Sequence, residues 1–269
     1  PVMIKPALSV AVKAARAAGT VILRRMARLD AIPVTEKDRF DFASEVDRQA
    51  EGEIIKELRR AFPRHAILAE ESGAQGKGDT VWVIDPLDGT HNYLRGIPHF
   101  CVSIAQMVRG HAELGVVFDP IRSELFTASR GGGAFLNDRR IRVADRRSLE
   151  GALVTTGLPF RQRDHLDPQL AMLRSMLVEA GAEDVRRTGS AALDLAYVAA
   201  GRCDGYFEPG LKPWDMAAGQ LLVREAGGHC TDFTGGDGFM HSGHVVAGNL
   251  KVVDAMLACI KPHLTTGLR

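Results

Sequence analysis

The sequence predicts a layered α/β protein. Apolar residues recur at helical spacing through roughly the first 60 residues, and short apolar segments separated by turn residues follow them. From about residue 151, strand-like and helix-like segments alternate. No linker-like or repeated stretch interrupts the 269 residues, so we expect one domain over residues 1–269. Helices and a largely antiparallel sheet would occupy about 1–148, and an α/β half about 149–269.

Two helices are expected first. One runs from Ala7 to about Arg28, and a second runs from Ser44 to Phe62, where Pro63 ends it. The first helix is amphipathic and carries arginines, as targeting peptides do. It lacks the long apolar core of a signal sequence and a clear cleavage site, so a folded helix is expected instead.

The next part of the chain predicts strands joined by tight turns. Arg109-Gly110-His111 and Asn137-Asp138 are typical of hairpin turns. The expected strands are Ala66–Leu68, Val81–Ile84, Cys101–Val108, Ala112–Phe118, Glu124–Ala128 and Gly133–Leu136.

The second half predicts alternating elements. Strands are expected at Leu153–Thr156, at Gly205–Glu208, and near Cys230 and Val245. Helices are expected near Pro168–Ala180, after Ser190, at Pro213–Ala226 and at Leu250–Ile260.

Composition excludes some classes of partner. Lys and Arg total 34 against 33 Asp and Glu, so the net charge of +1 gives no overall field for nucleic acid or membrane. The 4 cysteines lie far apart and form no CxxC pair, which indicates neither a zinc site nor a disulfide framework. Free thiols and a cytoplasmic location are therefore expected.

Two pairs of acids stand out. In VWVIDPLDGTHNY, Asp85 and Asp88 follow an apolar strand, and Glu70-Glu71 follows a neighbouring one. Carboxylates so close repel each other unless a cation or a proton lies between them. Mg²⁺ prefers oxygen ligands and keeps several waters, and two such ions about 3.5–4 Å apart form a clamp for phosphoryl displacement. The sequence therefore predicts a magnesium site, with Asp85 bridging two ions and the Leu87 carbonyl turned toward them.

Gly89-Thr90 would open a short helical turn beside this site, where backbone N–H groups favour a phosphate oxygen. A plain strand-ending turn is the alternative interpretation of DPLDGT, since Asp, Pro and Gly are common in turns. A second alternative is the superfamily that forms an aspartyl-phosphate on DxDGT. Here the first aspartate stands one residue too early for that motif.

Asp215 in PWDMAAG lies just inside an expected helix that Pro213 opens, where the helix dipole favours a carboxylate. Capping alone would explain it. Taken alone, Asp47 would be a solvated helix residue and Glu208 a surface acid.

With these motifs the sequence resembles the inositol monophosphatase family of magnesium-dependent, lithium-sensitive phosphatases. The resemblance rests on Trp82–Tyr93 and Trp214–Gly228, and it covers about residues 7 to 260. Shorter matches are DFASEVD (Asp41–Asp47), Glu70-Glu71 and Gly189-Ser190-Ala191-Ala192. RRTGSAALDLAYVAAGR is most similar to the bacterial SuhB-like branch.

The resemblance implies a layered αβαβα sandwich, commonly dimeric, and two to three Mg²⁺ ions with inhibition by Li⁺. The first ion would be held by Glu70, Asp85 and the Leu87 carbonyl, the second by Asp85, Asp88 and Asp215, and a weaker third by Glu70 through waters. Thr90 and Asp47 would orient and deprotonate the attacking water. Gly89 and Thr90 would hold the phosphate, and Asp88, Ala191 and Glu208 would face the alcohol.

The sequence departs from animal members at Lys212-Pro213 and in Gly157–Phe160, which lacks a serine near the sugar. Lys37 is similar to a lysine that the family keeps near the metals. The expected activity is hydrolysis of inositol 1-phosphate by a metal-activated water. Fructose 1,6-bisphosphate, histidinol phosphate and adenosine bisphosphates are alternative substrates.

The other function considered is a SuhB-like interaction protein of the transcription antitermination machinery, which would contact RNA polymerase-associated factors with or without phosphatase activity. Three paired arginines could serve such contacts, although paired arginines are usually a solvated face: Arg139-Arg140, Arg146-Arg147 and Arg186-Arg187.

Overall fold

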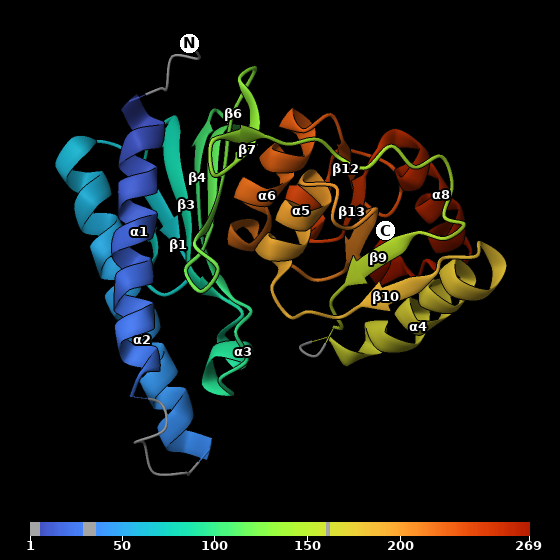
Figure 1. Ribbon diagram of the computed structural model, residues 1–269, viewed down its shortest axis with the longest axis horizontal. Coiled ribbons are helices and arrows are strands. Elements are labelled where there is room, and N and C mark those ends of the chain that lie inside the picture. Colours follow the sequence, from blue (N-terminus) through green and yellow to red (C-terminus); the bar gives the residue numbers. More distant parts are fainter. Residues whose placement is uncertain (1–5, 29–35, 160–161) are drawn as a thin grey trace.

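The computed structural model describes residues 6–28, 36–159 and 162–269, with the side chains of residues 36–44 left out. Helices and sheets alternate in an αβαβα arrangement (Figure 1). Helices α1 (Pro6–Met26) and α2 (Glu36–Ala61) cover one face of the first sheet, and α5 (Ala191–Ala199) and α6 (Pro213–Glu225) lie between the sheets. Helices α4 (Leu166–Arg174) and α8 (Leu250–Ile260) lie on the outer side of the second sheet. The expected fold class is confirmed.

The first sheet has the order β2-β1-β3-β4-β5-β6-β7-β8. Its neighbours pair antiparallel except β1 and β3, which run parallel. The largely antiparallel sheet expected for the first half is confirmed. Its strands are β1 (Ala66–Ala69), β2 (Gly73–Gln75), β3 (Thr80–Asp88), β4 (Cys101–Val108), β5 (His111–Asp119), β6 (Glu124–Ser129), β7 (Gly133–Leu136) and β8 (Arg139–Arg140).

Both expected hairpin turns are present. Arg109 and Gly110 join β4 to β5 with φ of 49° and 79°, and Asn137 and Asp138 join β7 to β8 with φ of 46° and 64°. Two-residue turns with positive φ at both positions match the twist of the flanking strands, and Gly, Asn and Asp tolerate that conformation.

The second sheet has the order β10-β9-β11-β13-β12, in which β9 pairs parallel with both β10 and β11. The alternation of strands and helices expected for this half is confirmed. Its strands are β9 (Leu153–Thr156), β10 (Asp184–Arg186), β11 (Gly205–Glu208), β12 (His229–Thr231) and β13 (Val245–Gly248). The short elements around them are α3 (Thr90–Leu94), α7 (Phe239–Ser242), the 3₁₀ turns η2 (Arg163–His165), η4 (Lys261–His263) and η5 (Thr266–Leu268), and the π-helical turn η3 (Ser175–Glu179).

Three apolar clusters hold the layers together. One lies between the first two helices and the first sheet, one around α5 and α6 between the sheets, and one on the outer face of the second sheet. By length and composition α1 is also apolar enough to cross a membrane, alone among the helices of the described residues. In the structure its face of Ala11, Ala14, Ala18 and Ile22 is buried in the first cluster. This spacing is the amphipathic one that predicts a packed surface helix.

Several boundaries differ from the expectation. The second helix begins at Glu36 rather than Ser44, and β3 continues past Ile84 to Asp88. The helix expected at Pro168–Ala180 is divided into α4 and the π-helical turn η3. Strands β2, β8 and β10 were not expected. Each is short and contains no buried residue, so no alternation of apolar residues indicates it.

Candidate active site

A bulge in β3 brings Asp85 and Asp88 to one side of the first sheet. Asp85 pairs with Ser103 and Asp88 with Cys101, so Pro86 and Leu87 lie opposite the single residue Val102. In a regular strand, residues three apart point to opposite faces, and one extra residue restores them to the same face. The expected end of this strand at Ile84 is therefore wrong: the strand continues to Asp88, and its bulge at Pro86 and Leu87 positions both carboxylates.

Glu70 reaches the same place from the neighbouring strand. Because β1 and β3 run parallel with Ala69 opposite Ile84, the next residues of the two strands are Glu70 and Asp85. The Glu70 amide also donates to the Ile84 carbonyl over 3.1 Å. The register thus brings the two acid pairs together at neighbouring strand ends, as the sequence indicated.

Asp47 approaches from α2. Its side chain is 7% exposed, and Oδ1 is buried with no hydrogen-bond partner among the described residues. An orphaned buried carboxylate oxygen is costly unless water or a cation contacts it. Burial, followed by the charges of Glu71 and Glu70, raises the pKa of Asp47 to about 8.

Glu51, one helical turn after Asp47, was missed by the sequence reasoning. It is 3% exposed and accepts hydrogen bonds from the backbone amides of Glu71 and Ser72 at 2.9 and 3.0 Å. These bonds fix the turn that follows β1 and so orient Glu70. The spacing of four residues from Asp47 on a buried helix face was the available signal.

Asp215 is the third residue of α6 and has two roles. Its Oδ2 accepts the Lys212 amide at 2.7 Å, which caps the helix that Pro213 begins. At the same time, oxygens of Asp85, Asp88 and Asp215 lie within 4.8 Å of one another. The capping role considered from the sequence and a place in the acidic cluster therefore coexist.

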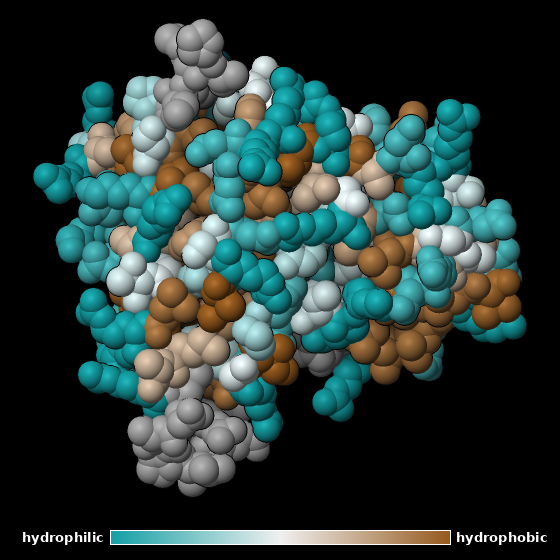
Figure 2. Space-filling view, in the orientation of Figure 1, coloured by the Kyte–Doolittle hydropathy of each residue, from teal (hydrophilic) through white to brown (hydrophobic). Residues whose placement is uncertain are grey.

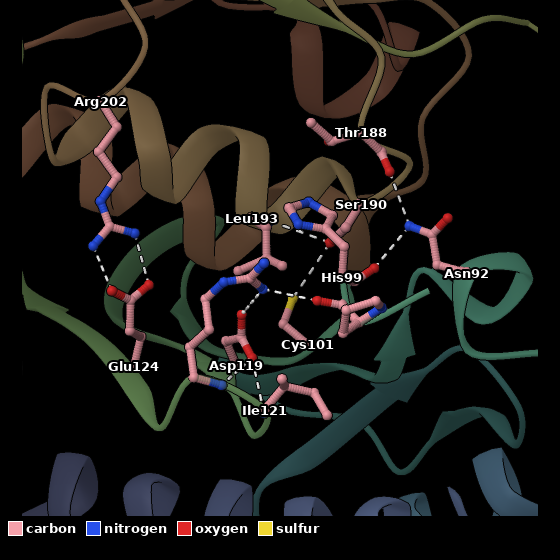
Figure 3. A network of polar contacts seen from close by, with 12 residues as sticks. Asn92, His99, Cys101, Asp119, Ile121, Glu124, Thr188, Ser190, Leu193 and Arg202 are labelled. Atoms are coloured by element: carbon pink, nitrogen blue, oxygen red, sulfur yellow. Dashed lines mark hydrogen bonds and ion pairs between the residues drawn. The ribbon is translucent and has the colours of Figure 1, made fainter. Parts of the chain in front are cut away.

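Asp88 is held by the second half of the chain. Ser190 Oγ and the Ala192 amide both donate to Asp88 Oδ2 at 2.7 Å. Ser190 is also the N-cap of α5, and its Oγ lies 3.6 Å from Cys101 Sγ (Figure 3). Both donors bind the same oxygen of Asp88, and the Gly89 amide also bonds to this carboxyl. The sequence reasoning did not assign this role to Ser190.

Asn92 of α3 makes a second connection between the halves. Its Nδ2 donates to the carbonyls of His99 and Thr188 at 2.7 and 2.9 Å (Figure 3). Thr188 in turn donates through Oγ1 to Asp194 of α5 at 2.7 Å. The loop before α5 is thereby fixed against the segment that carries Gly89 and Thr90.

The electrostatics of the cluster favour a cation. Burial raises the pKa of Asp85 well above its ordinary value, and the charges of Glu70, Asp88 and Asp215 raise it further. Burial also raises the pKa of Asp88 to about 6, although its bonds to Ser190 and Ala192 act in the opposite direction. A divalent ion among these oxygens would remove the repulsion, and hard carboxylate oxygens are the ligands Mg²⁺ prefers. The residues present fit such an ion.

Gly89 begins α3 in a conformation that only glycine adopts easily. Its φ is 98°, and a Cβ would lie 2.9 Å from the His99 carbonyl oxygen. The next residue, Thr90, donates its hydroxyl to the Leu87 carbonyl at 3.0 Å. A carbonyl oxygen has two lone pairs, so this bond leaves Leu87 one further acceptor site.

Glu208, the last residue of β11, lines the same cavity from the second sheet. Tyr206 donates its hydroxyl to Glu208 Oε2 at 2.7 Å, and burial raises the pKa of Glu208 to about 8. A Cβ on Gly157 would lie 2.1 Å from Glu208 Oε1, so the missing side chain at Gly157 makes room for this carboxyl. Glu208 is therefore protonated at neutral pH and can donate as well as accept.

One cavity of about 320 Å³ is lined both by the acidic cluster and by Glu208. Every site residue predicted from the sequence lines it: Asp47, Glu70, Asp85, Leu87, Asp88, Gly89, Thr90, Ala191, Glu208 and Asp215. Arg187 and Gln162 also line it, and the sequence reasoning assigned neither to the site. The side chain of Lys37 and all of Phe160 lie outside the described residues.

This fold and cavity agree with the family assignment by sequence. The family model described as "Inositol monophosphatase family" matches residues 3–264, and the chain belongs to that family. Among curated relatives, the Nus factor SuhB of Pseudomonas aeruginosa is 55% identical over 271 residues, covering 98% of this chain and 99% of the relative. The Nus factor SuhB of Escherichia coli K12 is 50% identical, with 98% and 99% covered. The expected resemblance is confirmed.

Solved structures show the same similarity. The native extragenic suppressor protein suhB from Bartonella henselae is 42% identical with a TM-score of 0.88, covering 97% of this chain and 100% of that one. The inositol monophosphatase from Anabaena is 37% identical with a TM-score of 0.84, covering 95% of each chain. Solved structures named suhB and solved structures named inositol monophosphatase therefore share this fold.

Proposed function

We propose that this protein is a Mg²⁺-dependent phosphomonoesterase that hydrolyses inositol 1-phosphate to inositol and phosphate. The observation that carries the proposal is the cluster of Asp85, Asp88 and Asp215 oxygens within 4.8 Å. It lies in a cavity that also contains Asp47 and Thr90. Membership of the family supports the class of reaction.

The cluster and its neighbours would hold two to three ions. Glu70, Asp85 and the Leu87 carbonyl would hold the first, Asp85, Asp88 and Asp215 the second, and Glu70 a third through waters. When bound, the cations supply the Lewis-acid clamp that phosphoryl transfer needs. Inhibition by Li⁺ is part of the same proposal.

Thr90 and Asp47 are the residues that would prepare the attacking water. Because the Thr90 hydroxyl proton is directed to the Leu87 carbonyl, its oxygen lone pairs are left to accept a hydrogen bond from water. Cations bound beside Glu70 would offset the carboxylate charges that raise the pKa of Asp47, so Asp47 would be ionised. Its Oδ1, which has no partner among the described residues, would then accept the proton that this water loses. Positioning and charge, rather than a covalent intermediate, would then lower the barrier.

The remaining lining residues would hold the substrate. Gly89 and Thr90 would contact the phosphate, and Asp88, Ala191 and Glu208 would contact the hydroxyl groups of the alcohol. A protonated Glu208 can donate to one hydroxyl and accept from another, which suits a polyol. The part of the cavity lined by Gly157, Glu208 and Gly210, here called the substrate end, therefore favours a small sugar-like phosphate.

The test is a panel of phosphate monoesters assayed with Mg²⁺ and ranked by kcat/KM, with Asp88→Asn beside the wild type. We expect inositol 1-phosphate to rank first and Asp88→Asn to lose more than about 100-fold in kcat/KM. The matched control is Asp237→Asn, whose carboxylate is 91% exposed and should leave activity unchanged. Normal turnover by folded Asp88→Asn would refute the assignment of Asp88 as a metal ligand. A higher kcat/KM for a bisphosphate would refute inositol 1-phosphate as the preferred substrate.

A second candidate function follows from the names of the relatives. We propose that the protein also binds RNA polymerase-associated antitermination factors. Of the paired arginines, Arg139, Arg140 and Arg147 are exposed and would serve such contacts, whereas Arg146 pairs with Asp204, Arg186 pairs with Asp184, and Arg187 lines the cavity. A pull-down with Asp88→Asn should retain binding, and one with the double variant R139S/R140S should lose it. The reverse pattern would contradict this second function.

A cytoplasmic homodimer is the last part of the proposal. Apolar side chains are exposed on α4 and η3, at Leu170, Leu177 and Val178, and Figure 2 shows brown residues gathered where Figure 1 places α4. Such a patch is suited to a second copy of the chain. Light scattering should show a dimer for the wild type and a monomer for Val178→Glu. A wild-type monomer at high concentration would contradict it.

A further inference from the structure

His244 touches the loop at the substrate end of the cavity without belonging to the acidic cluster. It follows α7 and is 6% exposed. The Gly210 amide donates to His244 Nδ1 at 3.1 Å, and His244 Nε2 lies 3.0 Å from the Gly267 carbonyl oxygen. Gly210 lines the cavity, whereas Gly267 belongs to the C-terminal turn η5. One imidazole therefore connects the cavity wall to the end of the chain.

The two contacts define the protonation state of the ring. An N–H group that donates to Nδ1 requires this nitrogen to carry no proton, so the neutral ring has its proton on Nε2 and donates it to Gly267. Burial and the neighbouring His165 lower the pKa of His244, while the bond to Gly267 and the charge of Asp232 act in the opposite direction. At neutral pH both bonds are therefore made.

The same loop has a second backbone support beside the first. The Leu211 amide donates to the Gly243 carbonyl at 2.9 Å. Gly243 has φ of 75°, and a Cβ there would lie 2.4 Å from the Leu211 carbonyl oxygen. Gly243 and His244 thus hold Gly210 and Leu211 from behind, and only the bond to His244 depends on a side chain.

The C-terminal turn is itself anchored. Leu268 is fully buried in the outer apolar cluster. A Cβ on Gly267 would lie 2.9 Å from His165 Cε1, and the rings of His165 and His244 meet edge-on at 5.9 Å. Phe233 packs on His244 with ring centroids 5.5 Å apart. The turn η5 therefore holds the Gly267 carbonyl at a fixed position beside the imidazole of His244.

We propose that His244 is a positioning residue, whose neutral imidazole fixes the Gly210 loop against the C-terminal turn and thereby sets the shape of the substrate end of the cavity. The proposal rests on the function proposed above, because it assigns this loop to the alcohol part of the substrate. Asp85 and Asp88 are held by other groups. Loss of the bridge, meaning the two hydrogen bonds that His244 makes with Gly210 and Gly267, should therefore raise KM and leave kcat unchanged.

Two amide variants separate the two bonds. In His244→Asn the Oδ1 atom replaces Nδ1 as an acceptor for Gly210, and in His244→Gln the Nε2 atom replaces the donor to Gly267. His244→Phe keeps the ring and makes neither bond. We expect KM for inositol 1-phosphate to rise about five- to tenfold in His244→Phe and His244→Gln and to stay within about twofold in His244→Asn. The kcat should change less than about twofold in all three.

The pH profile gives a readout that a merely structural role would not move. Because the pKa of His244 is lowered in the folded protein, the bridge is complete above the ordinary value of about 6.5 and is lost as pH falls through the folded value. The wild-type KM should rise in that acid range, and the KM of His244→Asn should lack this step. A folded His244→Phe with wild-type KM and pH profile would overturn the proposal.

A measurement without turnover keeps this proposal separate from the proposed function. Nitrogen NMR of the imidazole should show the neutral His244 ring protonated on Nε2. The Gly210 amide resonance should move in His244→Phe and His244→Gln and in a chain lacking residues 266–269, but stay in place in His244→Asn. A ring protonated on Nδ1 would overturn the bridge. If the resonances behave as expected and no phosphate ester is hydrolysed, the proposed function fails and the bridge stands.

Discussion

The two ends of the cavity are built differently. The metal end is made by strands of the first sheet, whose parallel and bulged register aims Glu70, Asp85 and Asp88 at one point. The substrate end is made by loops of the second half, around Gly157 and Gly210, which depend on glycines and on side-chain bonds. Rigid strands suit a cluster of repelling acids, whereas loops can change shape without disturbing it. Substitutions at the two ends should therefore have different signatures.

The largest expected effect comes from Asp85→Asn at the metal end. Asp85 is central to the cluster, so we expect kcat/KM to fall more than about 100-fold and the stabilisation by Mg²⁺ to vanish. Without metal, the variant should melt about 2–4 °C above the wild type, because a buried repelling acid has been removed. Thermal melting with and without Mg²⁺ measures both the Tm of the metal-free protein and the increase in Tm that Mg²⁺ causes. A variant that is less stable than the metal-free wild type would contradict the repulsion.

The next effect is at Ser190, where the second half touches the metal end. Ser190→Ala removes a donor to Asp88 Oδ2 and the cap of α5, so Mg²⁺ affinity should fall about 10–100-fold. Stability should fall by about 1 kcal/mol.

Ser190→Thr is the control, since it restores the hydroxyl. Mg²⁺ titration by calorimetry, followed by urea unfolding, measures both quantities. Equal Mg²⁺ affinity in wild type and Ser190→Ala would show that Ser190 does not position Asp88 for the ion.

A smaller effect is expected at Gly157, on the substrate end. In Gly157→Ala the new methyl group must displace the Glu208 carboxyl, since a Cβ would lie 2.1 Å from Oε1. We expect kcat/KM to fall about tenfold through KM, with Mg²⁺ affinity unchanged. A steady-state assay at several Mg²⁺ concentrations separates an effect on KM from an effect on Mg²⁺ affinity. A changed Mg²⁺ optimum would contradict the expectation that Gly157 acts only on the substrate end.

The smallest effect is a pH dependence from Glu208. Its raised pKa of about 8 means that the folded protein keeps this proton after the unfolded chain has lost it. The contribution of Glu208 to the free energy of unfolding is therefore fully present below about pH 4.5 and is lost progressively as pH rises toward 8.

Glu208→Gln, which resembles the protonated acid, should keep activity within a few-fold at neutral pH. The rise of KM that we expect for the wild type above about pH 8 should be absent. The same rise in Glu208→Gln would assign it to another group.

The sequence predicted the metal end well because its signal is local. The segment from Asp85 to Thr90 contains acids, a proline and a glycine next to one another. It can be recognised without knowing which strand it pairs with. The bulge was not predictable, because it is defined only by the pairing of β3 with β4. The same holds for β10, whose exposed residues become a strand only beside β9.

Residues that act through distant partners were missed. Ser190 donates to an aspartate 102 positions away, and Glu51 accepts amides 20 and 21 positions away. Their residue types are common at helix starts and on helix faces, so nothing local distinguishes them. Asp47 and Asp215 joined the site only through the resemblance, and the structure places both on the cavity wall.

The most direct test is anomalous diffraction from crystals soaked in Mn²⁺ as a stand-in for Mg²⁺. We expect a strong peak among the carboxylates of Asp85, Asp88 and Asp215, and we expect it to vanish in Asp85→Asn. A well-ordered wild-type crystal without a peak there, or one in which those oxygens face different cavities, would contradict it.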